Sequence, residues 1–550
     1  MPMQRMIPLL IFIFSSFMLW NAWQQEHAPK QTTSAQIQQK NTVTSTVPAS
    51  NTVPANNQSA GVTQLNTLNL TNMKQGERVK VSTDLFQAEF DTVGGDLRRL
   101  KLLKQLTTGD DPGKPLELFN DVGTIPYVVQ TGLIGNDLPN HTSTFVPSTT
   151  SATLEPGQNS LSISFKSVVP NKVELIKTYT FTRGSYLISL NTTIHNLENQ
   201  SLNVDSYFQF LRASTSPPGD PRFVSTYTGP AFYTDTTKFD KVSFKDIDKG
   251  THDYPGQANN GWVAMIQHYF ISAWLPSNGV QREFYARKVG NDLYTAGLII
   301  PVKNIAAGST SSINVPLYAG PQEGEKLKAL APGLQLTIDY GRLTIIATPI
   351  FYVLNLIHSW VNNWGVAIIL LTVLIKLIFF PLSAASYKSM ARMRTLQPKM
   401  TRLKEQYGDD KARLNQAMME LYRTEKINPL GGCLPMVVQI PVFISLYWVL
   451  LETVELRNAP FIGWIHDLSA KDPFYILPLI MTASMFIQQR MSPKPPDPVQ
   501  AKVMMFMPLM FSFMFFFFPS GLVLYWVVNN ILSIAQQWQI TRMIGDGNKK

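Results

Sequence analysis

The chain has 550 residues, of which 45% are hydrophobic and 15% charged, and its formal net charge is +10. Residues 24–350 carry 27 Lys and Arg against 26 Asp and Glu, whereas the rest of the chain carries 20 against 11. The excess positive charge therefore belongs to the part that contains the apolar runs. The positive-inside rule for membrane proteins explains it, and no specific binding of nucleic acid is expected. The single cysteine, Cys433, excludes a disulfide within the chain.

The N-terminus carries an uncharged apolar run, residues 6–23, preceded by Arg5. A cleaved signal peptide is one interpretation. No small-x-small cleavage site follows the run, however, and Trp20 and Trp23 suit a membrane interface. We therefore predict a signal-anchor span over residues 1–23, with its N-terminus in the cytoplasm. Residues 24–62 are rich in Gln, Thr, Asn, Ser and Ala, a composition that predicts a flexible linker.

Residues 63–340 alternate between apolar and polar side chains in many short segments. Examples are RVKVSTDLFQAEF, SLSISFKSV, ELIKTYTFT and SYLISLNTTIHNL, and the last two flank the turn sequence Arg183-Gly184-Ser185. This pattern predicts a large β-sandwich, which should lie outside the cytoplasm because it follows an anchor with a cytoplasmic N-terminus. Residues 343–359 predict an amphipathic helix lying on the outer face of the membrane.

Five more apolar segments predict transmembrane helices. The second span covers residues 360–383, and spans three to six lie within residues 429–541. Each can cross about 25–30 Å of hydrocarbon. Residues 384–428 carry ten Lys and Arg, whereas the connection between spans three and four carries two beside four acids. The rule that positive loops stay inside places residues 384–428, the N-terminus and the tail at 542–550 in the cytoplasm.

The cytoplasmic segment 384–428 has a helical pattern of its own. Apolar side chains recur at steps of three and four in two groups, and they are Met393, Leu396, Met400, Leu403 and Tyr407, then Leu414, Met418 and Leu421. Gly408 can end the first helix, and Asp409 or Asp410 can cap the second. The pattern predicts a short antiparallel helical hairpin.

Lys376 interrupts the apolar stretch GVAIILLTVLIKLIFFPLS at 365–383. A lysine in the middle of a span costs roughly 2.5–3.5 kcal/mol on insertion. Its side chain could reach the cytoplasmic surface along the helix, or it could face a hydrated cavity. We favour the cavity because polar side chains recur at membrane depth in other spans, where they need partners or water. The candidate groove residues are Lys376, Thr372, Gln439, Tyr525, Trp526, Asn529, Asn530, Ser533 and Gln536.

Signals of catalysis are weak along the whole chain. The seven histidines are scattered, and no zinc spacing, nucleophile elbow or phosphate-binding loop is present; GDDPGKP at 109–115 lacks the required pattern. We therefore expect a protein that is not an enzyme, with no catalytic residues, no metal site and no cofactor.

Three motifs carry a family resemblance: NPLGGCLPMVVQIPVFISLYWVL, APFIGWIHDLSAKDPFYILP and FPSGLVLYWVVNN. They resemble the YidC/Oxa/Alb family of membrane protein insertases, in its Gram-negative form. The likeness covers residues 360–541 by motif and residues 1–359 by architecture and the sequence TIDYG. It implies a polytopic α-helical protein of the bacterial inner membrane, with six spans, a five-helix insertase core and a large periplasmic β-supersandwich domain. It also implies a groove open to the cytoplasm and the lipid but closed to the periplasm.

The resemblance gives roles to individual residues. Lys376 matches a groove position that is usually Arg, and Trp526 matches one that is usually Tyr, so the charge and the aromatic ring persist without the guanidinium and the phenol. Thr372 matches another groove position. Lys376 would then attract the acidic, short translocated segments of substrates, while apolar substrate helices leave along spans three and five. The residues of this substrate slide are Met436, Phe443, Met507, Met510 and Met514.

The resemblance also implies partners. These are nascent integral membrane proteins, the Sec translocase with its SecD and SecF accessory part, a ribosome or targeting factor at the cytoplasmic hairpin and tail, and membrane lipids. Two functions of other classes compete. A small-solute transporter would show inverted repeats with broken helices, which five core spans do not display. A carbohydrate-active β-sandwich would need a convincing pair of acids, which the sequence lacks.

Overall fold

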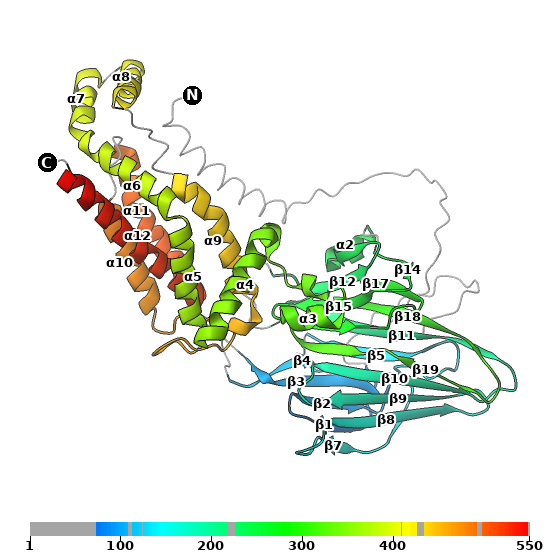
Figure 1. Ribbon diagram of the computed structural model, residues 1–550. Helices are drawn as coiled ribbons and strands as arrows, with labels where there is room; N and C mark the ends of the chain where they lie inside the picture. The colour runs from blue at the N-terminus through cyan, green and yellow to red at the C-terminus, as the bar shows by residue number, and fades with distance from the viewer. Residues whose placement is uncertain are drawn as a thin grey trace, which may run out of the picture.

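A computed structural model describes residues 73–107, 113–123, 125–217, 226–251, 254–408, 410–425, 434–491 and 498–547. The predicted anchor at 1–23 and linker at 24–62 lie outside these ranges. The chain forms a β-rich domain, residues 73–340, beside a helical region that begins near residue 341 (Figure 1). The predicted change from strands to helices near residue 340 is thus observed.

The β-rich domain contains three sheets. The first has the order β4 (Pro115–Phe119), β3 (Asp96–Leu106), β2 (Phe86–Asp91), β1 (Arg78–Ser82) and β7 (Ser151–Thr153). The third has the order β14 (Gln257–Ala258), β17 (Arg282–Gly290), β18 (Leu293–Ile305), β11 (Leu202–Ala213) and β5 (Tyr127–Ile134). Only the β1–β7 pair is parallel among the described strand pairs.

The second sheet is the largest. Its order is β13 (Lys238–Lys241), β12 (Gly229–Thr234), β15 (Trp262–Gln267), β16 (Phe270–Trp274), β20 (Leu317–Pro321), β10 (Leu187–Asn196), β9 (Val173–Thr182), β8 (Ser160–Val169) and β6 (Val146–Pro147), and β19 (Thr310–Asn314) also pairs with β10. Buried and half-buried residues alternate along β9 and β10, as their sequences predict. Gly184, at φ 71°, makes the predicted turn between these two strands.

A buried ion pair lies inside the β-rich domain. The Lys177 ammonium, fully buried, donates to Asp96 Oδ1 at 2.8 Å and to the carbonyl oxygens of Gly94 and Thr131 at 2.6 and 2.9 Å. Thr131 Oγ1 donates to the same Asp96 oxygen at 2.9 Å. The ammonium therefore exchanges water for three acceptors, one of them charged.

The described chain contains fourteen helical segments, five of them short and nine longer, and all of the longer ones lie in the helical region. The short ones are α2 (Phe244–Lys249), α3 (Gly324–Leu330), η3 (Leu334–Thr337), η4 (Gly341–Leu343) and η6 (Val454–Leu456). The longer ones are α4 (Thr344–Val361), α5 (Trp364–Ile378), α6 (Phe380–Thr395), α7 (Gln397–Tyr407), α8 (Lys411–Thr424), α9 (Leu434–Glu452), α10 (Ile476–Met491), α11 (Pro498–Phe515) and α12 (Ser520–Gly547). In the helical region α12 packs on α5, α6, α9 and α10, and α4 packs on α5 and α9.

Helices α7 and α8 form an antiparallel pair that projects from the helical region (Figure 1). Leu396 and Met400 are buried between them, with Met418 and Leu421 packed on the pair. Asp410 caps α8 by accepting from the Ala412 and Arg413 amides, as the sequence predicts. Asp409 and residues 426–433 lie outside the described chain, so the end of the hairpin stays a prediction.

The predicted second span, 360–383, is not one straight helix. It is divided between the end of α4, all of α5 and the start of α6, and α5 and α6 are bent by 67° at Phe379. Pro381 explains the restart, because a proline fits the first turn of a helix but has no amide to continue the preceding one. Lys376 therefore lies two residues from the end of its helix, closer than the sequence suggests.

Among the helices of the described ranges, α4 alone is long and apolar enough to cross a membrane by itself. Helices α5 and α6 meet that test only as a bent pair, and Val438–Glu452 forms a shorter apolar helix. Helices α5 and α10 have 15 and 16 residues, fewer than the roughly 20 that span a typical bilayer. The count of six spans thus stays a prediction, and so does the placement of α4 flat on the membrane surface.

Candidate functional site

Lys376 lies at the centre of a polar cluster within the helical region. Its side chain is 7% exposed, and its ammonium donates to Ser533 Oγ of α12 at 2.8 Å. No carboxylate pairs with it among the described residues. A neutral hydroxyl on another helix instead holds the ammonium inside the bundle.

The cluster extends across three helices. Ser533 Oγ donates to the Asn529 carbonyl one turn earlier at 2.7 Å, and Gln439 Nε2 of α9 donates to Asn529 Oδ1 at 2.6 Å. Because Asn529 and Ser533 are four residues apart, they lie on one face of α12. The structure thus joins α5, α9 and α12 through Lys376, Ser533, Asn529 and Gln439, four of the nine predicted groove residues.

Two other predicted groove residues bond elsewhere. Thr372 Oγ1 donates to the Ile368 carbonyl of its own helix at 2.6 Å. Asn530 Nδ2 turns toward α10, where it donates to Ser484 Oγ at 3.2 Å and approaches Met481 Sδ at 3.4 Å. Asn530 therefore links α12 to α10, a role that its sequence position next to Asn529 does not reveal.

Three predicted residues carry polar atoms that are buried without a hydrogen-bond partner in the described chain: Tyr525 Oη, Trp526 Nε1 and Gln536 Oε1. The Tyr525 and Trp526 rings pack on Phe443 of α9, with centroid separations of 6.3 and 4.5 Å. Buried polar atoms favour a partner, so this wall can bind an incoming donor or acceptor without breaking an existing bond.

The cavity at Lys376 is small in this conformation. Its volume is about 10 Å³, and it is lined by Ile375, Lys376, Phe379, Leu382, Ser383 and Gln439. That is the space of about one water molecule. A polypeptide segment can enter only if the helices around the cluster separate. In this conformation the cavity is therefore smaller than the open hydrophilic groove that the resemblance implies.

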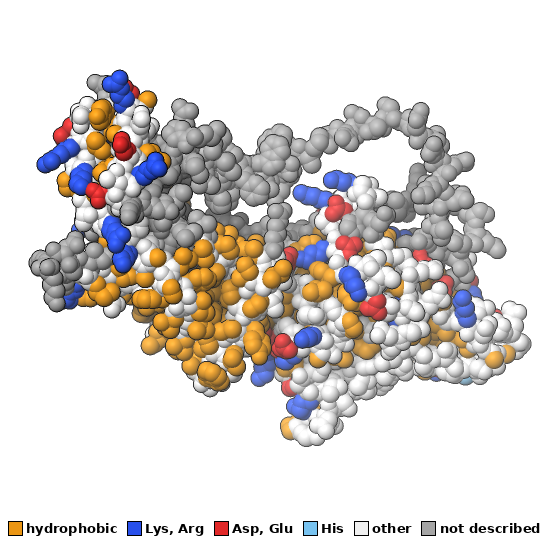
Figure 2. Space-filling model, turned by 45° about the horizontal axis from the view of Figure 1, so that its top comes forward, with side chains coloured by type: hydrophobic (Ala, Val, Ile, Leu, Met, Phe, Trp, Pro, Cys, Tyr) orange, Lys and Arg blue, Asp and Glu red, His pale blue; other side chains and the backbone are white. Residues whose placement is uncertain are grey.

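The predicted slide residues are split between exposed and packed positions. Met510 is 67% and Met514 39% exposed on α11, whereas Phe443 is half-buried against Trp526. Met436 lies in α9 and Met507 in α11, but their side chains lie outside the described part. Figure 2 shows hydrophobic side chains gathered over the helical region, between charged side chains on the hairpin and on the β-rich domain.

The end of the bundle opposite the hairpin is held by the connection between α9 and α10. Asn363 Nδ2 donates to the Phe461 carbonyl at 3.0 Å. The Ser520 and Gly521 amides at the start of α12 donate to the carbonyls of Ala470 and Leu468 at 2.7 and 2.9 Å. Sequence reasoning missed these three hydrogen bonds because each joins residues about 50 or more positions apart.

Comparisons with known proteins cover the whole described chain. The family model described as the 60Kd inner membrane protein matches residues 356–547, and that of the YidC periplasmic domain matches residues 78–353. The chain is 50% identical to the membrane protein insertase YidC of Nitrosospira multiformis, over 99% of this chain and 98% of that protein. It is 52% identical to the membrane protein insertase YidC of Aromatoleum aromaticum, with the same shares covered.

Among solved structures, the chain is similar to an active YidC insertase crystal structure with the first transmembrane domain resolved. The identity is 19% and the TM-score 0.39, over 84% of this chain and 92% of that one.

Proposed function

Because this chain belongs to the YidC family of membrane protein insertases, which act on nascent membrane proteins in the inner membrane, we propose that the cluster around Lys376 forms its substrate groove. The chain is an insertase and not an enzyme. A solute transporter has no support among the curated relatives named above.

The single observation that carries the proposal is the state of the Lys376 ammonium. It is buried, it is held by one neutral hydroxyl at 2.8 Å, and no carboxylate among the described residues neutralises it. A buried charge without a counter-charge is costly, and an acidic segment of a substrate that reached it would regain part of this cost. The ammonium thereby lowers the barrier for moving a short acidic segment across the membrane.

The polar atoms around Lys376 support the same role. Gln439 and Asn529 bond to each other, while Tyr525, Trp526 and Gln536 carry polar atoms that have no partner within the described ranges. Each can replace a hydrogen bond that a polar substrate backbone loses on leaving water. The exposed Met510 and Met514 then offer a flexible apolar surface along which a substrate helix moves into the lipid.

The positive-inside rule orients the remaining parts of the chain relative to the membrane. The basic hairpin of α7 and α8, together with the tail, faces the cytoplasm and meets the ribosome or a targeting factor, and the β-rich domain faces the periplasm. In this arrangement the protein works alone or with the Sec translocase, including SecD and SecF. The mixed apolar and polar surface in Figure 2 supports a membrane-embedded helical region between two polar ends.

Substitution of Lys376 tests the proposal. Lys376→Arg should retain insertion of single-span substrates, because the charge persists. Lys376→Ala and Lys376→Glu should slow insertion of substrates with acidic translocated segments at least about ten-fold, equivalent to roughly 1.4 kcal/mol in the barrier. The matched control is a substrate whose translocated segment is neutral, which should be affected much less. Equal rates for Lys376→Glu and the unchanged protein on the acidic substrate would refute the proposal.

A further inference from the structure

Six aromatic side chains pack together inside the helical region, next to the polar cluster of Lys376. They are Phe443 and Tyr447 of α9, Phe515 at the end of α11, Phe518 in the turn that follows, and Tyr525 and Trp526 of α12. Ring centroids of neighbouring members lie 4.5–6.3 Å apart, as in packed aromatic pairs. These six rings form one continuous group that joins three helices, which we call the aromatic layer.

The aromatic layer lies directly beside the polar cluster. In α9, Phe443 comes four residues after Gln439, and in α12, Tyr525 comes four residues before Asn529. Four residues of helix rise about 6 Å. Gln439 bonds to Asn529 and Phe443 packs on Tyr525, so the two helices run in opposite directions and the layer lies on the same side of the cluster in both. That side leads to the connection between α9 and α10, at the end of the bundle opposite the hairpin.

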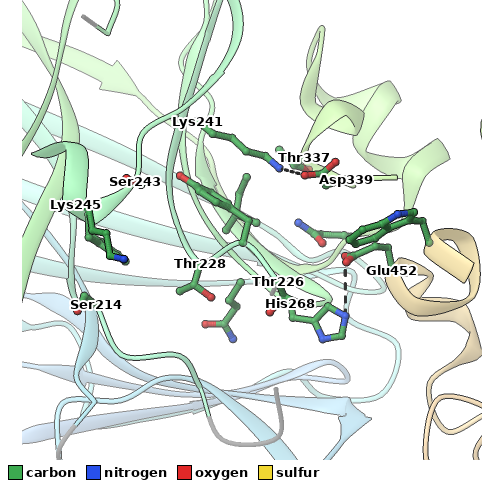
Figure 3. A pocket seen from close by; sticks show the side chains of 16 residues that line it. Ser214, Thr226, Thr228, Lys241, Ser243, Lys245, His268, Thr337, Asp339 and Glu452 are labelled. Atoms are coloured by element: carbon green, nitrogen blue, oxygen red, sulfur yellow. Dashed lines mark hydrogen bonds and ion pairs between the residues drawn. The ribbon is translucent and has the colours of Figure 1, made fainter. Parts of the chain in front are cut away.

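A second cavity, of about 380 Å³, lies at the far end of α9, between this helix and the β-rich domain (Figure 3). Trp448 of α9 and Gln322 of the β-rich domain line it, and Figure 3 shows charged and polar side chains around it, among them Thr228 and Lys241. A cavity of this size and polarity has room for many water molecules. Trp448 follows Tyr447 in α9, and their ring centroids are 5.6 Å apart. Along α9, the aromatic layer therefore lies between the polar cluster and a cavity that can hold water.

The layer itself offers water little to bind. Three of its six side chains are phenylalanines, and Phe515 and Tyr525 are only 2% and 1% exposed. The Trp526 ring is enclosed between Phe443 and Phe515, with centroid separations of 4.5 and 5.7 Å. A narrow apolar constriction excludes water, and ions do not cross it while it is dry. The layer thus has the properties of a barrier between two polar spaces.

We propose that the aromatic layer is a permeability barrier that keeps protons and small ions from crossing the membrane through the protein. The groove must hold water to receive polar substrate segments, and the layer stops that water from meeting the water at the outer end of α9. Phe515 is its central ring, because it packs on Trp526 of α12 and on Phe518 of the turn. The proposal rests on the proposed function, which makes the Lys376 cluster the hydrated side.

Removal of the Phe515 ring should open this barrier. Phe515→Ala leaves a cavity beside Trp526, because the side chains around a large-to-small substitution relax only in part. Trp526 Nε1 is buried without a hydrogen-bond partner among the described residues, so it can donate to water that enters this cavity. Phe515→Leu keeps most of the apolar volume and should keep the layer dry.

Proton flux into liposomes that contain the full chain, an entrapped pH-sensitive dye and an imposed membrane potential tests the barrier. The unchanged protein and Phe515→Leu should leak no faster than liposomes without protein, whereas Phe515→Ala should leak at least about ten-fold faster. Phe513→Ala is the matched control, because Phe513 lies on the same helix, is 70% exposed and is not part of the layer. Phe515→Ala should still insert a substrate whose translocated segment is neutral, which shows that the variant is folded.

Two results would overturn the assignment. The first is an equal proton flux for Phe515→Ala and Phe513→Ala while both insert the neutral substrate. The second is loss of insertion in both Phe515→Ala and Phe518→Ala, which would show that these rings hold the bundle together. If only Phe515→Ala fails to insert, the flux of Phe518→Ala decides in its place. The flux is measured without substrate and should stay low in Lys376→Glu, so failure of the barrier is separable from failure of the proposed groove.

Discussion

Two buried lysines, one in each region of the molecule, have different kinds of partner. In the β-rich domain, Lys177 meets Asp96 and two carbonyl oxygens within 2.9 Å. In the helical region, Lys376 meets a single neutral hydroxyl at 2.8 Å. Burial lowers the pKa of Lys177 and raises that of Asp96, and their mutual attraction opposes both shifts. Lys177 is therefore paired with a carboxylate, whereas Lys376 has no carboxylate partner among the residues that the structure describes.

Under our proposal, this difference separates a structural charge from a functional one. An ion pair such as Lys177–Asp96 stabilises one packing of the side chains around it. A charged ligand would gain little there, because both charges already have partners. A buried ammonium without a counter-charge raises the free energy of the folded protein, and an acidic group that binds beside it lowers that free energy. The comparison teaches that the Lys177 charge is paired within the β-rich domain, whereas under our proposal a substrate would supply the missing counter-charge in the groove cluster.

Deletions should give the largest contrast between the two regions. Removing residues 65–320 with the first span retained should leave basic insertion largely intact, because the groove cluster lies wholly in the helical region. Removing residues 343–358 should abolish growth, because Ala347 and Leu354 are fully buried where α4 packs on α5 and α9. Complementation of a depletion strain at matched expression measures both. Loss of growth with the first deletion and survival with the second would reverse the comparison.

Breaking the Lys177 pair should affect folding more than any change at Lys376. Lys177→Met leaves the buried Asp96 carboxylate without its ion-pair partner, with only the Thr131 hydrogen bonds and the attraction of Arg98, so the free energy of unfolding should fall by about 3–5 kcal/mol. Denaturant unfolding of the full chain, followed by proteolysis of the β-rich domain, reports it. Combining Lys177→Met with Asp96→Leu should restore most of the loss, since neither charge of the pair is then left without the other.

Lys376→Met provides the matched comparison. It should leave the free energy of unfolding unchanged or slightly higher, because Ser533 keeps its bond to the Asn529 carbonyl. A loss as large as that of Lys177→Met would show that both lysines are structural and would remove the distinction.

The smallest expected effect lies where the two regions meet. Burial, aided by repulsion from Glu323, raises the pKa of Glu455 from its ordinary value of 4.5 to about 7. A carboxyl whose pKa is higher in the folded chain binds more protons there, so stability is greatest below about pH 4.5 and declines as the pH rises to about 7. Glu455→Gln should flatten this decline and add about 1 kcal/mol near pH 8. Thermal unfolding of both proteins between pH 5 and 8 measures it, and parallel profiles would contradict it.

The sequence predicted most of what depends on local pattern. The alternation in β9 and β10, the turn at Gly184 and the Asp410 cap all follow from neighbouring residues. The placement of Asn529 and Ser533 on one face of α12 also follows from local sequence, since a helix repeats every 3.6 residues.

What depends on tertiary packing could not be predicted in this way. Asn530 faces α10 and Lys376 reaches Ser533 because of how α12 is rotated against its neighbours, which periodicity does not fix. The bend at Phe379 was hidden because an apolar run continues through it. The cavity beside Gln322 joins residues that are more than 200 positions apart in the sequence.

The central claim is that the polar cluster of α5, α9 and α12 faces the substrate during insertion. Photocrosslinking from positions 439 and 526 to a stalled nascent membrane protein tests it most directly, with position 484 as the control, because Ser484 is buried where α10 meets Asn530. Strong crosslinks to the nascent chain from 439 and 526 and almost none from 484 are the predicted result. Crosslinks from 484 that equal those from 439 and 526, or none from these two positions, would contradict the claim.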